Sequence, residues 1–200
     1  MTDYVLLGRE VRAATLLFSP ASYLTDNLLA LAGSSQFNVT TTNPIPVLLD
    51  MLERPLMRPN TAVIGSAAWT QVRQNPFLVQ AVRGGSAVGG VITAEQFAAL
   101  LEVDKVLIGK SRLNVARKGQ TANLQRVWGK HIALLYLNRL ADNRQGITFG
   151  WTAQYGQRIA GRQSDSKIGM RGGLRVRVGE SVEERVVAAA AGAFIQNAVA

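Results

Sequence analysis

The sequence predicts an α+β fold, and three features of its hydrophobic pattern indicate this class. Apolar residues recur at helical spacing early in the chain, short continuous apolar runs typical of buried strands follow, and a period of two takes over from Gly146 onward. The chain has 200 residues, of which 48% are hydrophobic and 18% charged. This length and composition suffice for the core of one large domain or two small ones.

The N-terminal part of the chain is predicted to be helical. Apolar residues at helical spacing on both sides of Ser19 predict a pair of helices within residues 9–32, with Gly33 as the stop. A further helix is expected over residues 44–53, because Asn43 is a suitable cap, a proline fits the first turn and an apolar stripe follows.

The middle of the chain is predicted to combine short buried strands with short helices. Continuous apolar runs bounded by turn residues predict the strands, and Ser or Thr before an apolar stripe predicts the start of a helix. In chain order we expect a strand over 61–65, a helix from Ser66 through Trp69 to Asn75, a short turn at Pro76, a flexible glycine-rich loop over 84–90, a helix from Thr93 to Leu101, a strand over 106–109, a polar loop over 114–123 and a strand over 131–137.

The last third is predicted to form half-exposed antiparallel strands. Leu174, Val176 and Val178 alternate with Arg175 and Arg177, so one face of this strand is apolar and the other carries the two arginines. We expect the apolar face to lie on the core. The alanine-rich tail, residues 186–200, is interpreted as a strand because its paired valines and its Phe-Ile step favour extended structure.

Positive charge is concentrated in one stretch of the chain. The whole sequence has 22 Lys and Arg against 13 Asp and Glu, a formal net charge of +9. Residues 105–177 alone hold 15 basic and two acidic residues, a net charge of +13. One interpretation of this distribution is a nucleic acid partner, and the alternatives are a solvated basic face or acidic protein partners.

The sequence offers no set of catalytic, cofactor-binding or metal-binding residues. Cysteine is absent and histidine occurs once, at position 131, which excludes disulfides, iron–sulfur clusters and Cys/His zinc sites. The segment 108–111 ends like a phosphate-binding loop but has Asp104 where that motif needs its first glycine. We therefore expect a protein that is not an enzyme and has no cofactor. No apolar run approaches the length that crosses a bilayer, so we expect a soluble protein with no membrane partner.

A series of short motifs follows in a fixed order from residue 34 to residue 200: Asn43-Pro44-Ile45, Arg58 to Gly65, Trp69, Asn75-Pro76, Thr93-Ala94-Glu95, Val106 to Asn114, Val127 to Lys130, Thr148 to Trp151 and Ile195 to Ala198. This series resembles the major capsid proteins of tailed bacteriophages, which have the Hong Kong 97-type fold. The resemblance implies a peripheral domain with a spine helix and late antiparallel strands, made from residues 38–59 and 140–200. An axial α/β domain would be inserted as residues 60–139. Residues 1–37 would be a residual N-terminal arm and E-loop region, although their pattern favours helix over the family's usual hairpin.

The resemblance also implies a function. The protein would be a structural subunit that assembles into pentamers and hexamers of an icosahedral head around double-stranded DNA. Its partners would be itself, that DNA, and other head proteins such as portal, scaffold or decoration proteins, in the virion and, during assembly, the host cytoplasm. Two alternatives remain open: an encapsulin-type nanocompartment shell, and a basic nucleic-acid-binding module.

The candidate residues for contacts with another subunit or with DNA are Arg158, Arg162, Lys167, Arg171, Arg175 and Arg177. Arg175 and Arg177 would repel one another unless something negative lies opposite, either a carboxylate of a neighbouring subunit or packaged DNA. Candidate carboxylates, within the tail or across a subunit boundary, are Glu180, Glu183 and Glu184.

Overall fold

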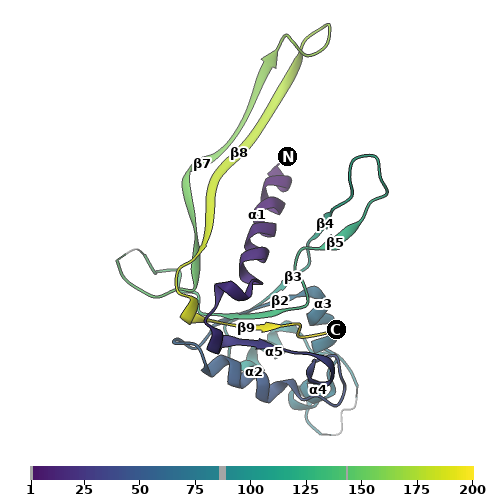
Figure 1. Ribbon diagram of the computed structural model, residues 1–200, viewed down its shortest axis with the longest axis vertical. Coiled ribbons are helices and arrows are strands. Elements are labelled where there is room, and N and C mark those ends of the chain that lie inside the picture. The colour runs from purple at the N-terminus through teal and green to yellow at the C-terminus, as the bar shows by residue number, and fades with distance from the viewer. Residues whose placement is uncertain (1, 86–88, 143) are drawn as a thin grey trace.

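The computed structural model describes residues 2–85, 89–142 and 144–200. A body of sheet and helices carries three projections on one side: a long hairpin, a short hairpin and the N-terminal part of α1 (Figure 1). The helices are α1 (Thr2–Leu17), α2 (Pro44–Glu53), α3 (Ser66–Val72), α4 (Pro76–Arg83) and α5 (Ala94–Leu101), with short 3-10 turns at η1 (Pro20–Ser22), η2 (Thr25–Asn27), η3 (Gly33–Ser35) and η4 (Ala189–Ala191). None of the described helices is long and apolar enough to cross a membrane.

A five-stranded mixed sheet forms the centre of the body. Its order is β1 (Leu28–Ala30), β9 (Gly192–Gln196), β6 (Ile132–Leu135), β2 (Thr61–Gly65) and β3 (Lys105–Gly109). β6 runs antiparallel to both β2 and β9, whereas β1 is parallel to β9 and β2 is parallel to β3. Every residue of β2 and β6 is buried, as expected for strands covered on both faces. The strands predicted near 61–65, 106–109 and 131–137 are confirmed. The strand predicted over 186–200 is confirmed in part, because β9 is preceded by the 3-10 turn η4.

Helices α2 to α5 cover one face of this sheet. Ile64, Ile132 and Ile195 point into the same apolar cluster as Leu48 of α2 and Phe97 of α5. Local sequence sets where these helices begin. The side chain of Asn43 accepts a hydrogen bond from the backbone N–H of Ile45, and Thr93 forms a reciprocal capping box with Gln96.

The other face of the sheet is covered by the C-terminal end of α1 and by aromatic side chains. Val63, Ala133 and Phe194, which alternate with the residues of the first cluster along their strands, pack here with Ala14 of α1. Tyr23 stacks between Phe149 and Phe194, with ring centroids 5.0 and 5.2 Å away, and its hydroxyl donates to the carbonyl of Leu17 at 2.7 Å. The central strands of the sheet are thus buried on both sides.

The predicted second helix of residues 9–32 is wrong. α1 ends at Leu17, and two 3-10 turns lead into β1, whose Leu28 and Leu29 pair with β9. The buried side chain of Asn27 donates to the carbonyl of Gly192 at 3.0 Å, which fixes this segment at the sheet edge. Tertiary hydrogen bonding to the sheet therefore outweighs the helical spacing of the leucines.

Three smaller expectations also need correction or fall outside the described residues. The helix at 66–75 stops at Val72 and begins with Ser66 rather than being capped by it, because Gly65 occupies the cap position. Pro76 does not make a short turn but opens α4, with the side chain of Asn75 accepting from the backbone N–H of Phe77. Within the expected loop over 84–90, residues 86–88 lie outside the described residues.

The buried cluster under the helices contains residues from each of the expected segments, 1–37, 38–59, 60–139 and 140–200. Phe37, Leu48, Ile64 and Ile195 all belong to it, and the sheet likewise combines strands from three of these segments. Residues from all the expected segments thus share one buried cluster, and the division into peripheral and axial domains stays a prediction.

Two hairpins leave this body. The long hairpin pairs β7 (Gly150–Asp165) with β8 (Gly173–Val186), with an irregularity in register between Tyr155 and Ile159. The short hairpin pairs β4 (Arg112–Asn114) with β5 (Leu124–Arg126). The alternating pattern after Gly146 is thus confirmed as antiparallel strands.

We expect Trp69→Ala to lower the free energy of unfolding by about 3–5 kcal/mol, because the indole is lost from a buried site. Trp69 is 6% exposed and meets Phe97 edge to face at 5.5 Å. Denaturant titration followed by circular dichroism measures the change. Gln71→Ala, at an exposed site of the same helix, is the control and should change the value by about 0.5 kcal/mol or less. A loss below about 1 kcal/mol for Trp69→Ala would contradict the packing.

Stability should also depend on the protonation of His131. Its Nδ1 accepts the backbone N–H of Asn197 at 2.9 Å, while burial, helped by Lys130, lowers the pKa of the imidazole from its usual 6.5. The unfolded chain takes up this proton first, so stability should fall as the pH drops below about 6.5. Urea titrations between about pH 7.5 and 5 should show this loss, and His131→Gln should reduce it. An unchanged pH dependence in His131→Gln would show that another group is responsible.

Candidate interaction surface

Helix α1 is attached to the long hairpin by an ion pair. The guanidinium of Arg12 donates from Nε and Nη2 to the two carboxylate oxygens of Glu184 on β8, at 2.9 and 3.1 Å, and Arg9 approaches the same carboxylate at 3.9 Å. The Glu184 side chain is only 9% exposed. The hydrogen bond from Arg12 lowers the pKa of Glu184 below its usual value, so the carboxylate stays ionised to lower pH.

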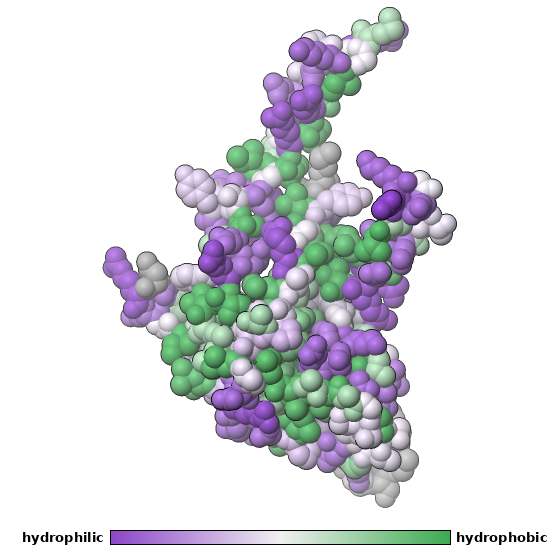
Figure 2. Space-filling view, in the orientation of Figure 1, coloured by the Kyte–Doolittle hydropathy of each residue, from purple (hydrophilic) through white to green (hydrophobic). Residues whose placement is uncertain are grey.

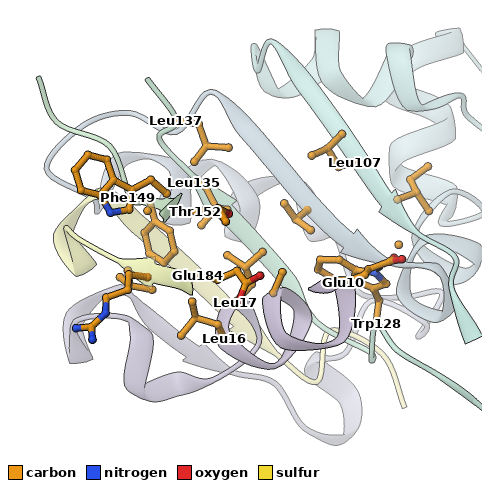
Figure 3. Close-up of a pocket in the computed structure, with 18 residues that line it drawn as sticks. Glu10, Leu16, Leu17, Leu107, Trp128, Leu135, Leu137, Phe149, Thr152 and Glu184 are labelled. Atoms are coloured by element: carbon orange, nitrogen blue, oxygen red, sulfur yellow. Dashed lines mark hydrogen bonds between the residues drawn. The ribbon is translucent and has the colours of Figure 1, made fainter. Parts of the chain in front are cut away.

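Helix α1 is attached to the body through Glu10. One carboxylate oxygen of Glu10 accepts from the indole Nε1 of Trp128 at 2.6 Å and also from the hydroxyl of Ser111. Between α1, the sheet and the base of the long hairpin lies an apolar pocket of about 320 Å³, lined by residues such as Leu17, Leu107 and Phe149 (Figure 3). Its two carboxylates, Glu10 and Glu184, are both engaged in the contacts that hold α1. In the described part of the chain, no three His, Asp or Glu residues are placed to hold a metal ion.

The long hairpin brings together all six candidate residues named from the sequence. Arg158 and Arg162 lie on β7, Lys167 and Arg171 in the turn, and Arg175 and Arg177 on β8. Residues 156–179 contain these six basic residues and one acidic residue, a net charge of +5. The outer part of the hairpin is therefore a basic arm.

Within the chain, the carboxylate partners expected for Arg175 and Arg177 are wrong, whereas pairing across a subunit boundary stays a prediction. Glu180 pairs with Arg158 across the strands at 2.9 Å, and Glu184 is held by α1. Arg175 instead meets Asp165 on the neighbouring strand at 2.7 Å. The register of the hairpin decides these pairs, and the sequence does not reveal it. The described residues form no ion pair with the other four candidates, which are Arg162, Lys167, Arg171 and Arg177.

The apolar face of β8 is not part of the core, contrary to expectation. The alternation is as predicted, but Leu174 is 66% and Val176 44% exposed, because the hairpin extends past the reach of the body. On the opposite face, Tyr155 and Ile159 are 87% and 72% exposed. Figure 2 shows hydrophilic and hydrophobic residues alternating along this arm. Several exposed apolar side chains on a basic arm are typical of a contact with another macromolecule.

The short hairpin carries basic residues that are not among the candidates named from the sequence. They are Lys110, Arg112, Arg117, Lys118 and Arg126, and residues 110–126 contain no Asp or Glu. The sequence pattern predicts only a polar loop over residues 114–123. The absence of acidic residues from 110–126 is the sequence feature that could have identified this basic segment.

A body with two basic, projecting hairpins is typical of proteins that associate with other macromolecules. Comparison with known proteins identifies the relatives. No family model matches the chain. It is 43% identical over 199 residues to the major capsid protein of Pseudomonas phage JBD67, covering 100% of this chain and 64% of that protein. It is 26% identical over 140 residues to the major capsid protein of Burkholderia phage BcepMu, covering 68% of this chain and 44% of that protein.

The chain is therefore homologous to phage major capsid proteins, along its whole length in one case and over 68% of it in the other, which confirms the resemblance to phage major capsid proteins. It spans less than two thirds of the length of these relatives. A crystal structure of a phage-related protein from Bordetella bronchiseptica RB50 has the same fold, with a TM-score of 0.80 at 22% identity. That match covers 96% of this chain and 62% of the other.

The ion pair between Arg12 and Glu184 should hold the base of the long hairpin against α1. We expect Glu184→Gln to speed amide hydrogen exchange in β8 and α1, because the neutral side chain loses the charge-assisted bond. Glu183→Gln is the matched control, since among the described residues the ion pair of Glu183 is with Arg185 on its own strand. Lowering the pH through the depressed pKa of Glu184 should mimic the variant in the wild-type protein. Equal exchange in both variants would contradict this role.

Proposed function

We propose that this chain is the shell-building part of a phage major capsid protein with the Hong Kong 97-type fold. In this proposal it assembles with copies of itself into pentamers and hexamers of an icosahedral head that encloses double-stranded DNA. The names of two homologues support the capsid role. They favour it over an encapsulin-type shell or a separate nucleic-acid-binding module.

The observation that carries the proposal is the uncovered long hairpin. A two-stranded ribbon is marginally stable alone in water, and this one exposes Tyr155, Ile159 and Leu174. Burial of these side chains against another molecule would stabilise the ribbon by about 25 cal/mol for each Å² of apolar surface removed from water. A shell subunit meets such a partner in its neighbours.

Charge restricts which part of a neighbour the hairpin contacts. Two hairpins with a net charge of +5 each would repel if they lay side by side. Residues 1–104 and 178–200, by contrast, each have a net charge of −2. We therefore place the hairpin of one subunit on the body or hairpin base of the next. Such head-to-tail contacts close into rings, as pentamers and hexamers require.

We also revise the proposed domains. Because α1 contacts β8 through Arg12 and Glu184, α1 and the long hairpin together are our candidate for the peripheral domain. α1, rather than residues 44–53, then takes the place of the spine helix. The sheet and helices α2 to α5 become the axial domain. Portal, scaffold or decoration proteins and the packaged DNA are the further partners in this proposal, in the virion and in the host cytoplasm during assembly.

Two double variants test the hairpin. Leu174→Thr with Val176→Thr reduces the apolar surface and places a residue with high strand propensity at both sites, and Arg171→Glu with Arg177→Glu reverses charge at two exposed arginines that form no ion pair within the described residues. Both should melt like the wild type, because the altered sites are exposed, and both should reduce the yield of rings or shells in light scattering and negative-stain microscopy.

The matched control is Arg139→Glu with Arg144→Glu, the same charge change at exposed sites off the hairpins, which should assemble normally. Normal assembly of both hairpin variants would refute the role of the hairpin. A wild-type chain that stays monomeric across concentration and salt would count against the capsid function itself.

A further inference from the structure

The short hairpin differs in chemistry from the long one. Residues 110–126 hold five basic residues and no acidic residue, a net charge of +5. The described residues form no ion pair with any of the five. The hairpin stands on the same side of the body as the long hairpin and the N-terminus of α1 (Figure 1). It is thus a second, separate concentration of positive charge.

Two arginines lie directly opposite one another in this hairpin. Arg112 and Arg126 are cross-strand partners in the β4–β5 ladder, and both are exposed. Like charges at directly opposed positions destabilise a strand pair. Arg126 donates from Nη1 to the hydroxyl of Ser66 at 2.7 Å, which orients its guanidinium without neutralising it. An anion bound near this pair would relieve the repulsion.

The loop beyond these arginines is ordered by its own hydrogen bonds. The side-chain oxygen of Asn114 accepts from the backbone N–H groups of Ala116 and Asn123, at 3.1 and 2.9 Å. Gly119 has φ +84°, a conformation that suits glycine, and the N–H of Gln120 bonds to the carbonyl of Arg117. Arg117 and Lys118 therefore sit on a preformed turn, so little ordering would accompany ligand binding.

The residue types favour phosphate over protein as the ligand. The loop adds Gln120, Thr121 and Asn123 around a polar hollow, and such side chains commonly donate to phosphate oxygens. Between residues 110 and 126 there is no Trp, Tyr, Phe or Met. The aromatic anchors of protein interfaces are therefore missing, and so are the rings on which unpaired bases stack. Figure 2 accordingly shows this projection as mainly hydrophilic at its tip.

We propose that the short hairpin, residues 110–126, binds the phosphate backbone of double-stranded DNA without reading its sequence. This inference rests on the proposed function, because a head subunit is where the chain would meet duplex DNA. It assigns DNA contact to Arg112, Arg117, Lys118 and Arg126, and leaves the long hairpin to contacts between subunits.

Two variants of equal charge test this division. In the short-hairpin variant, Arg112, Arg117, Lys118 and Arg126 become Gln; in the matched control, Arg162, Lys167, Arg171 and Arg177 become Gln. Each full-length protein is titrated onto a fluorescein-labelled duplex of mixed sequence, and anisotropy is read between about 50 and 200 mM salt. The short-hairpin variant should bind at least about tenfold more weakly, and its salt slope should fall by about 0.9 for each phosphate that it no longer neutralises. The control should keep the wild-type slope.

Three outcomes would overturn the proposal. The first is wild-type DNA affinity in the short-hairpin variant, and the second is an equal loss of affinity in the control, which would indicate net charge alone. The third is tighter binding of poly-glutamate than of the duplex, abolished in the same variant, which would identify an acidic protein partner. Circular dichroism checks folding, and the smaller variant Arg117→Gln with Lys118→Gln at the turn should show part of the effect. Shell formation is scored separately by microscopy, so a failure of the capsid function is not confused with a failure of this site.

Discussion

The position of α1 is the constraint on which the outer part of the structure depends. Glu10 and Arg12 are two residues apart, so on an α-helix they point about 200° apart around the axis. Glu10 therefore binds Trp128 of the body while Arg12 binds Glu184 of the long hairpin. Gly109 makes the first contact possible, because a Cβ there would lie 2.0 Å from the Trp128 ring. These two contacts, rather than a hydrophobic core of its own, fix the orientation of the long hairpin relative to the body.

The two hairpins divide the positive charge of the sequence into two kinds of surface. The long hairpin combines arginines with exposed apolar side chains and satisfies two of its arginines internally, through Glu180 and Asp165. The short hairpin has no carboxylate and sets Arg112 against Arg126. The first chemistry suits a protein surface, and the second suits a polyanion.

Much of the body could be predicted from the sequence, because its signals are local. The all-apolar run 61–65 indicated a strand covered on both faces, and caps at Asn43 and Thr93 marked helix starts. The candidate surface could be predicted only in part. Alternation assigned Arg175 and Leu174 to opposite faces, but it does not show whether anything covers a face, nor which carboxylate lies across the strand. Those facts depend on tertiary placement and on a register irregularity near Tyr155.

The same basic residues also account for how an exposed ribbon avoids pairing with the wrong surface. Both outer edges of the long hairpin are open in the described chain, and open edges with apolar side chains invite edge-to-edge association. Four of the six basic residues of the long hairpin have no carboxylate partner among the described residues. Two long hairpins therefore repel one another, whereas a long hairpin and the less basic body do not. In the proposed shell, the apolar side chains supply the attraction and the charge selects the partner. Leu174 and Tyr155 can then stay exposed in a free subunit, because the pairing of two long hairpins that these side chains would favour is opposed by the repulsion between their positive charges.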